Sequence, residues 1–207
     1  ATTENISNIA TLNFDVAAGD DVTVDDNGNN DLDGVDNATD VTVTGGNSLS
    51  TFQLGATNDT LGTANSGSYN LETIDASQFS GNVVLSFADD KLTNSQTITG
   101  SDASTDSVVA SFTASGNADG ALEMAGIETF TVDADGDLRT AGGNELNFAN
   151  VTGLSTLIVE NVGNEDDVEL TDVAADTVQL GTQEDGNGDA FDNAVLQVDA
   201  ASTSGTN

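Results

Sequence analysis

The chain has 207 residues and carries 36 Asp and Glu against two Lys and Arg, for a formal net charge of −34. It therefore cannot neutralise phosphates, which excludes nucleic acid and anionic membrane surfaces as partners. It contains no Cys and no His, so neither disulfides nor the usual nucleophile–base pairs of enzymes can form. We expect a protein that is not an enzyme and that needs bound cations, because a compact state with this charge repels itself.

The apolar content permits only a thin core. Leu, Ile, Val and Phe make up about 24% of the chain, a little above the roughly 20% below which a highly charged chain is disordered. No run of about 20 apolar residues is present, so no segment is expected to span a membrane. The scarcity of aromatic and basic residues suits a protein made in bulk for export, and we expect an extracellular, cell-surface location.

A six-residue pattern recurs along the chain: apolar, any, usually Thr, apolar, any, apolar. Its copies begin 40, 22, 56, 27 and 21 residues apart, and we expect each of the two long intervals to contain two units. Repetition with a period between about 20 and 50 residues is typical of repeat and solenoid proteins. The copies occupy residues 9–14, 49–54, 71–76, 127–132, 154–159 and 175–180.

Shorter segments between these copies alternate between apolar and polar residues, as half-buried strands do. Gly, Asn and Asp fill the gaps and tolerate the positive φ that tight turns require. No segment has a helical period, so the sequence predicts an all-β protein. The additional strands are expected at residues 22–24, 41–43, 83–87, 146–148, 168–170 and 195–198.

Two all-β architectures fit this pattern, a parallel β-solenoid and a β-sandwich. The solenoid is favoured because it requires equivalent residues to recur once per coil, so that they stack about 4.8 Å apart. We expect irregular coils of about 21–28 residues in one elongated β domain over residues 1–207, with a subdivision near 90–126 as the alternative. The Thr of each copy should then form one ladder, made of Thr11, Thr51, Thr73, Thr129, Thr156 and Thr177.

Three segments resemble the repeats of RTX-type bacterial S-layer proteins: residues 125–132 (AGIETFTV), 146–157 (LNFANVTGLSTL) and 174–181 (AADTVQLG). Residues 97–106 (TITGSDASTD) resemble a degenerate RTX turn, and the resemblance extends over residues 49–200. It implies a parallel β-solenoid, calcium binding, type I export and assembly into a surface lattice. The chain departs from the family in having no intact G-G-x-G-x-D nonapeptide, which puts a regular calcium ladder in doubt.

Three acidic stretches have the composition of calcium-binding loops. Calcium takes six to eight oxygen ligands, which alternate Asp and Asn residues in a Gly-containing loop can supply. None of the three matches the full EF-hand pattern. The predicted Ca²⁺ ligands are Asp133, Asp135 and Asp137 in one stretch, Asp185, Asn187, Asp189 and Asp192 in the second, and Asp25, Asn27, Asn29, Asp31 and Asp33 in the third.

The alternative interpretation is that these residues are ordinary turn residues on a solvated surface. Weaker metal candidates are residues 58–59 and 102–106, and the pairs at 20–21, 89–90 and 166–167 either bridge neighbouring molecules or are simply solvated. Lys91 and Arg139 either make weak surface pairs or contact an acidic patch of a neighbouring subunit.

These features predict a self-assembling subunit of a calcium-dependent cell-surface layer or extracellular fibre. Its partner would be a further copy of itself, with surface polysaccharide as a second partner. The alternatives are a calcium-dependent adhesin module that binds glycans or surfaces and, third, an ice-binding protein. Because repeat units begin close to Ile9 and end close to Val198, we expect solenoid ends that pair head to tail between copies.

Overall fold

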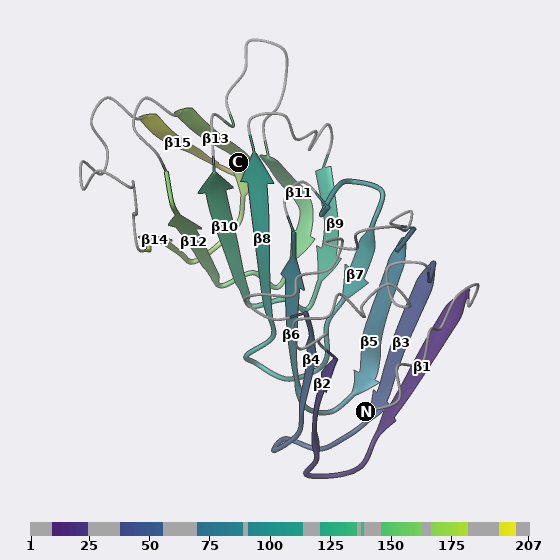
Figure 1. Cartoon of the computed structure of the whole chain (residues 1–207). Helices are drawn as coiled ribbons and strands as arrows, with labels where there is room; N and C mark the ends of the chain where they lie inside the picture. The colour runs from purple at the N-terminus through teal and green to yellow at the C-terminus, as the bar shows by residue number, and fades with distance from the viewer. Residues whose placement is uncertain are drawn as a thin grey trace, which may run out of the picture.

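The computed structural model describes residues 10–24, 38–55, 70–88, 91–113, 121–135, 138, 146–162, 167–181 and 195–201. These residues form strands in two sheets, and every pairing within a sheet is parallel (Figure 1). The described part of the chain holds no helix that could cross a membrane. The predicted all-β class and the parallel β-solenoid are confirmed.

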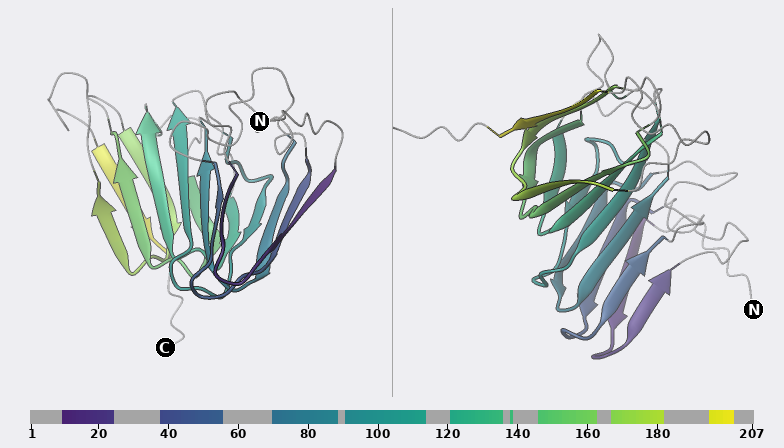
Figure 2. Two further views of the ribbon diagram at one scale, coloured as in Figure 1. Left: turned by 60° about the horizontal axis from the view of Figure 1, so that its bottom comes forward. Right: turned by 90° about the vertical axis from the view of Figure 1, so that its left-hand side faces the viewer.

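The chain alternates between the two sheets, so each pair of consecutive strands makes one coil. Figure 2 shows the two sheets facing each other, with the strands of each sheet stacked along the molecule. The eight-stranded sheet A contains β1 (Thr11–Val16), β3 (Asp40–Gly45), β5 (Thr73–Phe79), β7 (Thr97–Thr99), β9 (Ala121–Ala125), β11 (Leu146–Thr152), β13 (Asp167–Val173) and β15 (Val195–Ala200). The seven-stranded sheet B contains β2 (Asp21–Val24), β4 (Thr51–Leu54), β6 (Asn82–Phe87), β8 (Ser107–Thr113), β10 (Thr129–Asp135), β12 (Thr156–Glu160) and β14 (Thr177–Leu180).

The core lies between the sheets and is built by the alternation of side chains along each strand. In β4, Phe52 and Leu54 are fully buried, whereas Thr51 and Gln53 are half-buried on the outer face. Phe side chains connect the sheets: the rings of Phe14 and Phe52 are 5.1 Å apart. Each buried side chain of this size contributes about 1.5–3 kcal/mol, so a core one layer thick can hold the coils together.

The predicted single Thr ladder is wrong. Thr11 and Thr73 lie in sheet A, whereas the other four lie in sheet B. Of these six residues, three stack directly on one another, all in sheet B: Thr129, Thr156 and Thr177. The six-residue pattern describes any half-buried strand that follows a turn, so it cannot distinguish one sheet of a two-sheet coil from the other.

The coils are also less uniform than predicted. The residue offset between stacked strands is 21 from Thr156 to Thr177 but 33 from Asp40 to Thr73. The extra length lies mostly in the connections from sheet B to sheet A, since β5 and β6 on the opposite edge are only two residues apart. Uneven coils therefore do not prevent strands from stacking in register.

The turns from sheet A to sheet B pack directly on one another. A Cβ at Gly81 would overlap the carbonyl oxygen of Ser50, and a Cβ at Gly100 would overlap that of Gly126. Glycine is required at these two positions because the backbones of successive turns approach too closely for a side chain.

Candidate functional site

Of the twelve predicted calcium ligands, Asp133 and Asp135 lie within the described residues, in β10. The Asp133 side chain is half-buried and accepts a hydrogen bond from the Asn161 amide at 2.6 Å. The structure describes the backbone of Asp135 in β10 but not its side chain. The other ten predicted ligands lie outside the described residues: Asp137, Asp185, Asn187, Asp189, Asp192, Asp25, Asn27, Asn29, Asp31 and Asp33.

Parallel register places Asp133 directly beside Glu160 on the neighbouring strand β12. Like charges in directly opposite positions of a sheet destabilise the pairing, and a cation between them would remove this repulsion. The Glu160 side chain also occupies the space into which a Cβ on Gly181 would project. Two carboxylates do not make a complete calcium site, and no group of three or more His, Cys, Asp or Glu placed to hold a metal occurs among the described residues.

All three predicted stretches belong to connections that follow strands of sheet B in the sequence: the first begins within β10, and the other two follow β14 and β2. The carboxyl ends of parallel strands meet along the same edge of a sheet. Connections from sheet B to sheet A contain 18 of the 36 acidic residues and both basic ones, whereas connections from A to B contain five acidic residues. Negative charge is therefore concentrated in the long connections at this edge.

On the opposite edge, Asp106 joins three successive turns. Its Oδ1 accepts the backbone N–H of Val83 at 2.8 Å, and its Oδ2 accepts that of Ser101 at 2.6 Å. The backbone N–H of Asp106 donates to Oε2 of Glu128 at 2.9 Å, and its carbonyl oxygen accepts the N–H of Thr129. Asp106 is fully buried, and these hydrogen bonds give it a structural role.

Burial raises the pKa of Asp106 above its ordinary value of 3.8, although the N–H groups of Val83 and Ser101 oppose this change. Burial also raises the pKa of Glu128 above 4.5, and the nearby Asp106 carboxylate adds to that rise. The Ser101 hydroxyl lies 2.7 Å from the carbonyl oxygen of Gly81 and 2.8 Å from Oδ2 of Asp106. It has one proton for two acceptors, so a protonated Asp106 would satisfy both contacts.

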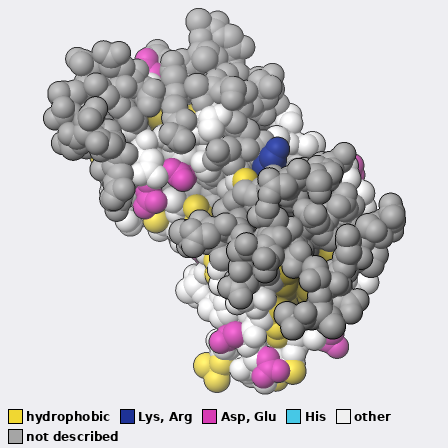
Figure 3. All heavy atoms as spheres, in the orientation of Figure 1, with side chains coloured by type: hydrophobic (Ala, Val, Ile, Leu, Met, Phe, Trp, Pro, Cys, Tyr) yellow, Lys and Arg dark blue, Asp and Glu magenta, His cyan; other side chains and the backbone are white. Residues whose placement is uncertain are grey.

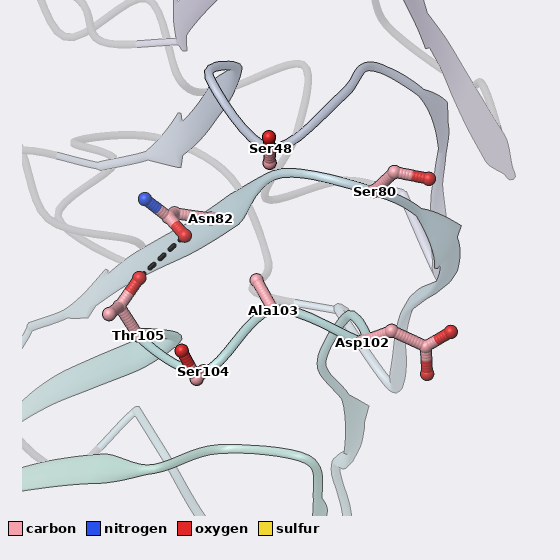
Figure 4. A pocket seen from close by; sticks show the side chains of 7 residues that line it. All are labelled: Ser48, Ser80, Asn82, Asp102, Ala103, Ser104 and Thr105. Atoms are coloured by element: carbon pink, nitrogen blue, oxygen red, sulfur yellow. Dashed lines mark hydrogen bonds between the residues drawn. The ribbon is translucent and has the colours of Figure 1, made fainter.

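A groove of about 460 Å³ lies over these turns, lined by Ser48, Ser80, Asn82, Asp102, Ala103, Ser104 and Thr105 (Figure 4). Asn82 and Thr105 point toward each other and share a hydrogen bond, whereas the Asp102 carboxylate points away from them. The hydroxyl and amide groups that line the groove can donate hydrogen bonds to a polyhydroxylated ligand and accept them from it. The groove lining contains no aromatic side chain on which a sugar ring could stack.

The remaining acidic candidates have separate local roles. Oδ1 of Asp21 accepts the N–H of Thr51 at 2.9 Å, so this residue ties two stacked strands together. Residues 58–59, 89–90 and 166 lie outside the described residues, as does Arg139. Lys91 lies in the β6–β7 connection.

Acidic side chains on the strands obtain hydrogen bonds from amides. Glu123 accepts from Asn150, and Asp172 accepts from Asn147 at 3.3 Å. These amides lie one coil away, so the bonds cross between stacked strands without adding charge. Figure 3 shows acidic side chains scattered over the described surface of one face, with only a small basic area.

The outer faces of the two sheets differ in charge. The strands of sheet A contain eight acidic residues, and those of sheet B contain four. Two adjacent rows across β6, β8, β10, β12 and β14 contain no charge at all. One row is Val84, Ser107, Thr129, Thr156 and Thr177, and the other is Ser86, Val109, Thr131, Ile158 and Gln179. We call these ten residues the neutral face.

Comparisons of the chain with protein-family models, with curated proteins and with solved structures find no match.

Proposed function

We propose that this protein is a structural subunit of a calcium-dependent extracellular layer or fibre, assembled from copies of itself. The solenoid provides a stack of coils held by continuous backbone ladders, which is a suitable element for a rigid assembly. The observation that carries the proposal is the neutral face on sheet B.

Copies that each carry a formal charge of −34 repel one another, so their contacts must exclude most of the acidic surface. The neutral face offers such a surface on five neighbouring strands, with Val109 37% exposed near its centre, although Ser86 and Thr131 in the same row are buried. Thr and Val side chains on the outer face of a sheet can pack against the same side chains of another copy.

Calcium has two roles in this proposal. It would bind carboxylates at the edge where the long connections leave sheet B, and it would reduce the repulsion between assembled copies. The opposed pair Asp133 and Glu160 supports the first role, because two carboxylates in register favour a cation between them. The concentration of acidic residues in these connections supports the second.

The test compares Val109→Glu, which places a charge on the neutral face, with Thr152→Glu, which adds the same charge to an exposed position of sheet A. Wild-type protein should form sheets or filaments in calcium, visible by negative-stain electron microscopy, and should lose them in chelator. Val109→Glu should prevent assembly, whereas Thr152→Glu should retain it. Equal assembly by the two variants would contradict a role for the neutral face, and a wild type that stays monomeric in calcium would contradict the proposed function.

A second candidate, a glycan-binding adhesin module, is favoured by the groove. Its hydroxyl and amide groups could bind an uncharged polysaccharide without any assembly of copies. Calorimetric titration with neutral oligosaccharides tests this function. Binding by monomeric protein that is lost in Asn82→Ala would support the adhesin, and the absence of heat with all ligands would oppose it.

A further inference from the structure

The strands of the neutral face differ in the order of their larger and smaller side chains. On β6 the larger Val84 comes before the smaller Ser86, whereas on β8 the smaller Ser107 comes before the larger Val109. On β10 both rows hold Thr, so the two side chains are equal in size. Each strand therefore offers one residue to each row, and the sizes in the two rows are complementary on β6 and β8.

Val109 projects from this face. It is 37% exposed, although its neighbours in the same row, Ser86 and Thr131, are buried. Ser107, two residues earlier on the same side of β8, is half-buried and has a shorter side chain. One strand thus carries a projecting residue and a recess, and surfaces of this kind fit together when large residues face small ones.

We propose that the neutral faces of two copies pack on each other about a two-fold axis perpendicular to the strands of sheet B, and that this contact needs no calcium. Such an axis lays each strand over the same strand of the other copy with its direction reversed, so each row faces the other row. Val109 then lies over the partner's Ser107, and Val84 lies over the partner's Ser86. The face is therefore complementary to itself in size, as the packing of two sheets requires.

The distribution of charge favours this axis over one that runs parallel to the strands. Connections from sheet B to sheet A contain 18 acidic residues, and those from A to B contain five. A parallel axis would place the two acid-rich edges side by side, at a sheet separation of about 10 Å that is close to the ~8 Å screening length at physiological salt. The perpendicular axis instead places the acid-rich edge of each copy beside the acid-poor edge of the other. The two faces therefore need no cation between them, and calcium acts at contacts between dimers.

The size of the neutral face predicts a weak dimer. Five strands about 4.8 Å apart extend roughly 24 Å along the stack, and two rows roughly 7 Å apart cover a band roughly 14 Å wide. The contact therefore covers about 340 Å² of each copy, less than half of the roughly 800 Å² per partner that is typical of a stable interface. Dimers should form at high protein concentration and become persistent when further contacts join them in a layer.

Exchanging the two sizes on β8 tests this packing without adding charge. Ser107→Val sets two valines against each other and Val109→Ser sets two serines against each other, so each single variant should weaken dimerisation about tenfold. The double variant Ser107→Val/Val109→Ser again pairs a large with a small residue in each contact, so it should dimerise as the wild type does. Sedimentation at several protein concentrations, in chelator and in calcium, measures association, and circular dichroism checks that each variant retains its fold.

Cross-linking measures the strand order in the dimer independently of those variants. Thr156→Cys and Ile158→Cys, both on β12, are prepared separately in the 207-residue protein, which has no Cys of its own. The two are mixed in chelator with a short bis-maleimide, because residues on packed sheets lie about 10 Å apart. This mixture should link efficiently, since β12 lies over β12 of the partner. Ser107→Cys mixed with Thr156→Cys is the competing pair, which a parallel axis through β10 would bring together, and Thr152→Cys on sheet A gives the background.

Three results would each overturn the inference. They are a wild type that stays monomeric in chelator at every concentration, a double variant that associates as weakly as the single variants, and stronger linking of the competing pair than of the β12 pair.

The inference rests on the proposed function, since it uses the neutral face as a contact between copies, but the two can fail separately. A dimer that forms in chelator but never assembles further in calcium would retain the two-fold contact and refute the layer or fibre. Layers that form in calcium from a wild type that is monomeric in chelator would refute the two-fold contact and retain the proposed function.

Discussion

Replacing Asp106 with Ala tests whether the buried carboxylate holds successive coils together. The side chain accepts backbone N–H groups from Val83, 23 residues earlier in the chain, and from Ser101, five residues earlier. Both bonds are buried, so water cannot replace the lost acceptor without entering the space between the turns.

The size of the effect follows from the two backbone N–H groups, of Val83 and Ser101, that would lose their acceptor. A buried donor left without an acceptor costs about 1–3 kcal/mol, so the loss of two should make Asp106→Ala lower the free energy of unfolding by about 2–6 kcal/mol. The stability of Asp106→Asn should fall between those of wild type and Asp106→Ala, because its carboxamide has one oxygen in place of two and can accept only one of the two N–H groups. Asp102, exposed in the same turn, provides the control: Asp102→Ala should change stability by no more than about 0.5 kcal/mol.

Urea denaturation in calcium, followed by far-UV circular dichroism, measures these differences. The three variants should have equal slopes and different midpoints, provided that unfolding remains two-state. If Asp106→Ala and Asp102→Ala have the same midpoint as wild type, the buried hydrogen bonds contribute nothing net, and the assignment of Asp106 as a structural link is refuted.

Two further predictions concern single positions. Gly100→Ala should destabilise the protein by about 1–3 kcal/mol in urea denaturation, because its Cβ overlaps the Gly126 carbonyl oxygen, whereas Ser104→Ala in the same turn should have little effect. Glu160→Gln should raise the stability in chelator by about 0.2–1 kcal/mol and reduce the further gain from calcium, since it removes the repulsion with Asp133. Glu123→Gln, at a carboxylate already bonded to an amide, is the matched control, and equal responses of the two Gln variants would argue against a cation at the Asp133–Glu160 pair.

The solenoid could be predicted because repeated apolar positions have a direct physical cause. Core-facing residues such as Phe52 and Leu157 must recur once per coil, and their alternation with Thr marks half-buried strands. The sheet to which each strand belongs could not be predicted in the same way. The turn from β5 to β6 is as short as a hairpin turn, yet it leads to the other sheet.

The candidate site was harder to predict, since its contacts join residues far apart in sequence. Asp106 looks like any acidic turn residue until Val83 is placed beside it. The pairing of Asp133 with Glu160 follows the same offset of 27 residues as the repeat copies at 127–132 and 154–159, so this contact did have a signal in the sequence. Exposure of Leu180 carries no sequence signal, because the apolar residues in register with it in the preceding coils, Val159 and Val132, are fully buried.

The burial of Asp106 and Glu128 also leads to a prediction about pH. Burial favours the neutral form of Asp106, whereas its hydrogen bonds from Val83 and Ser101 favour the carboxylate, and burial has the larger effect on the pKa. The raised pKa values of Asp106 and Glu128 have the same sign: the folded state binds protons more tightly than the unfolded state. For acids of this kind, stability is highest at low pH and is lost as the pH rises above their ordinary values of 3.8 and 4.5.

We therefore expect the urea midpoint in chelator to be higher at about pH 5 than at pH 7, where self-repulsion among the carboxylates is also greater. Glu128→Gln is the discriminating variant, because its amide oxygen can still accept the N–H of Asp106 but can no longer titrate. It should be at least as stable as wild type at pH 7 and should show a smaller change between the two pH values. A wild-type midpoint that rises from pH 5 to pH 7 would mean that the donors around Asp106 outweigh its burial, and the carboxylate would then be the favoured form in the fold.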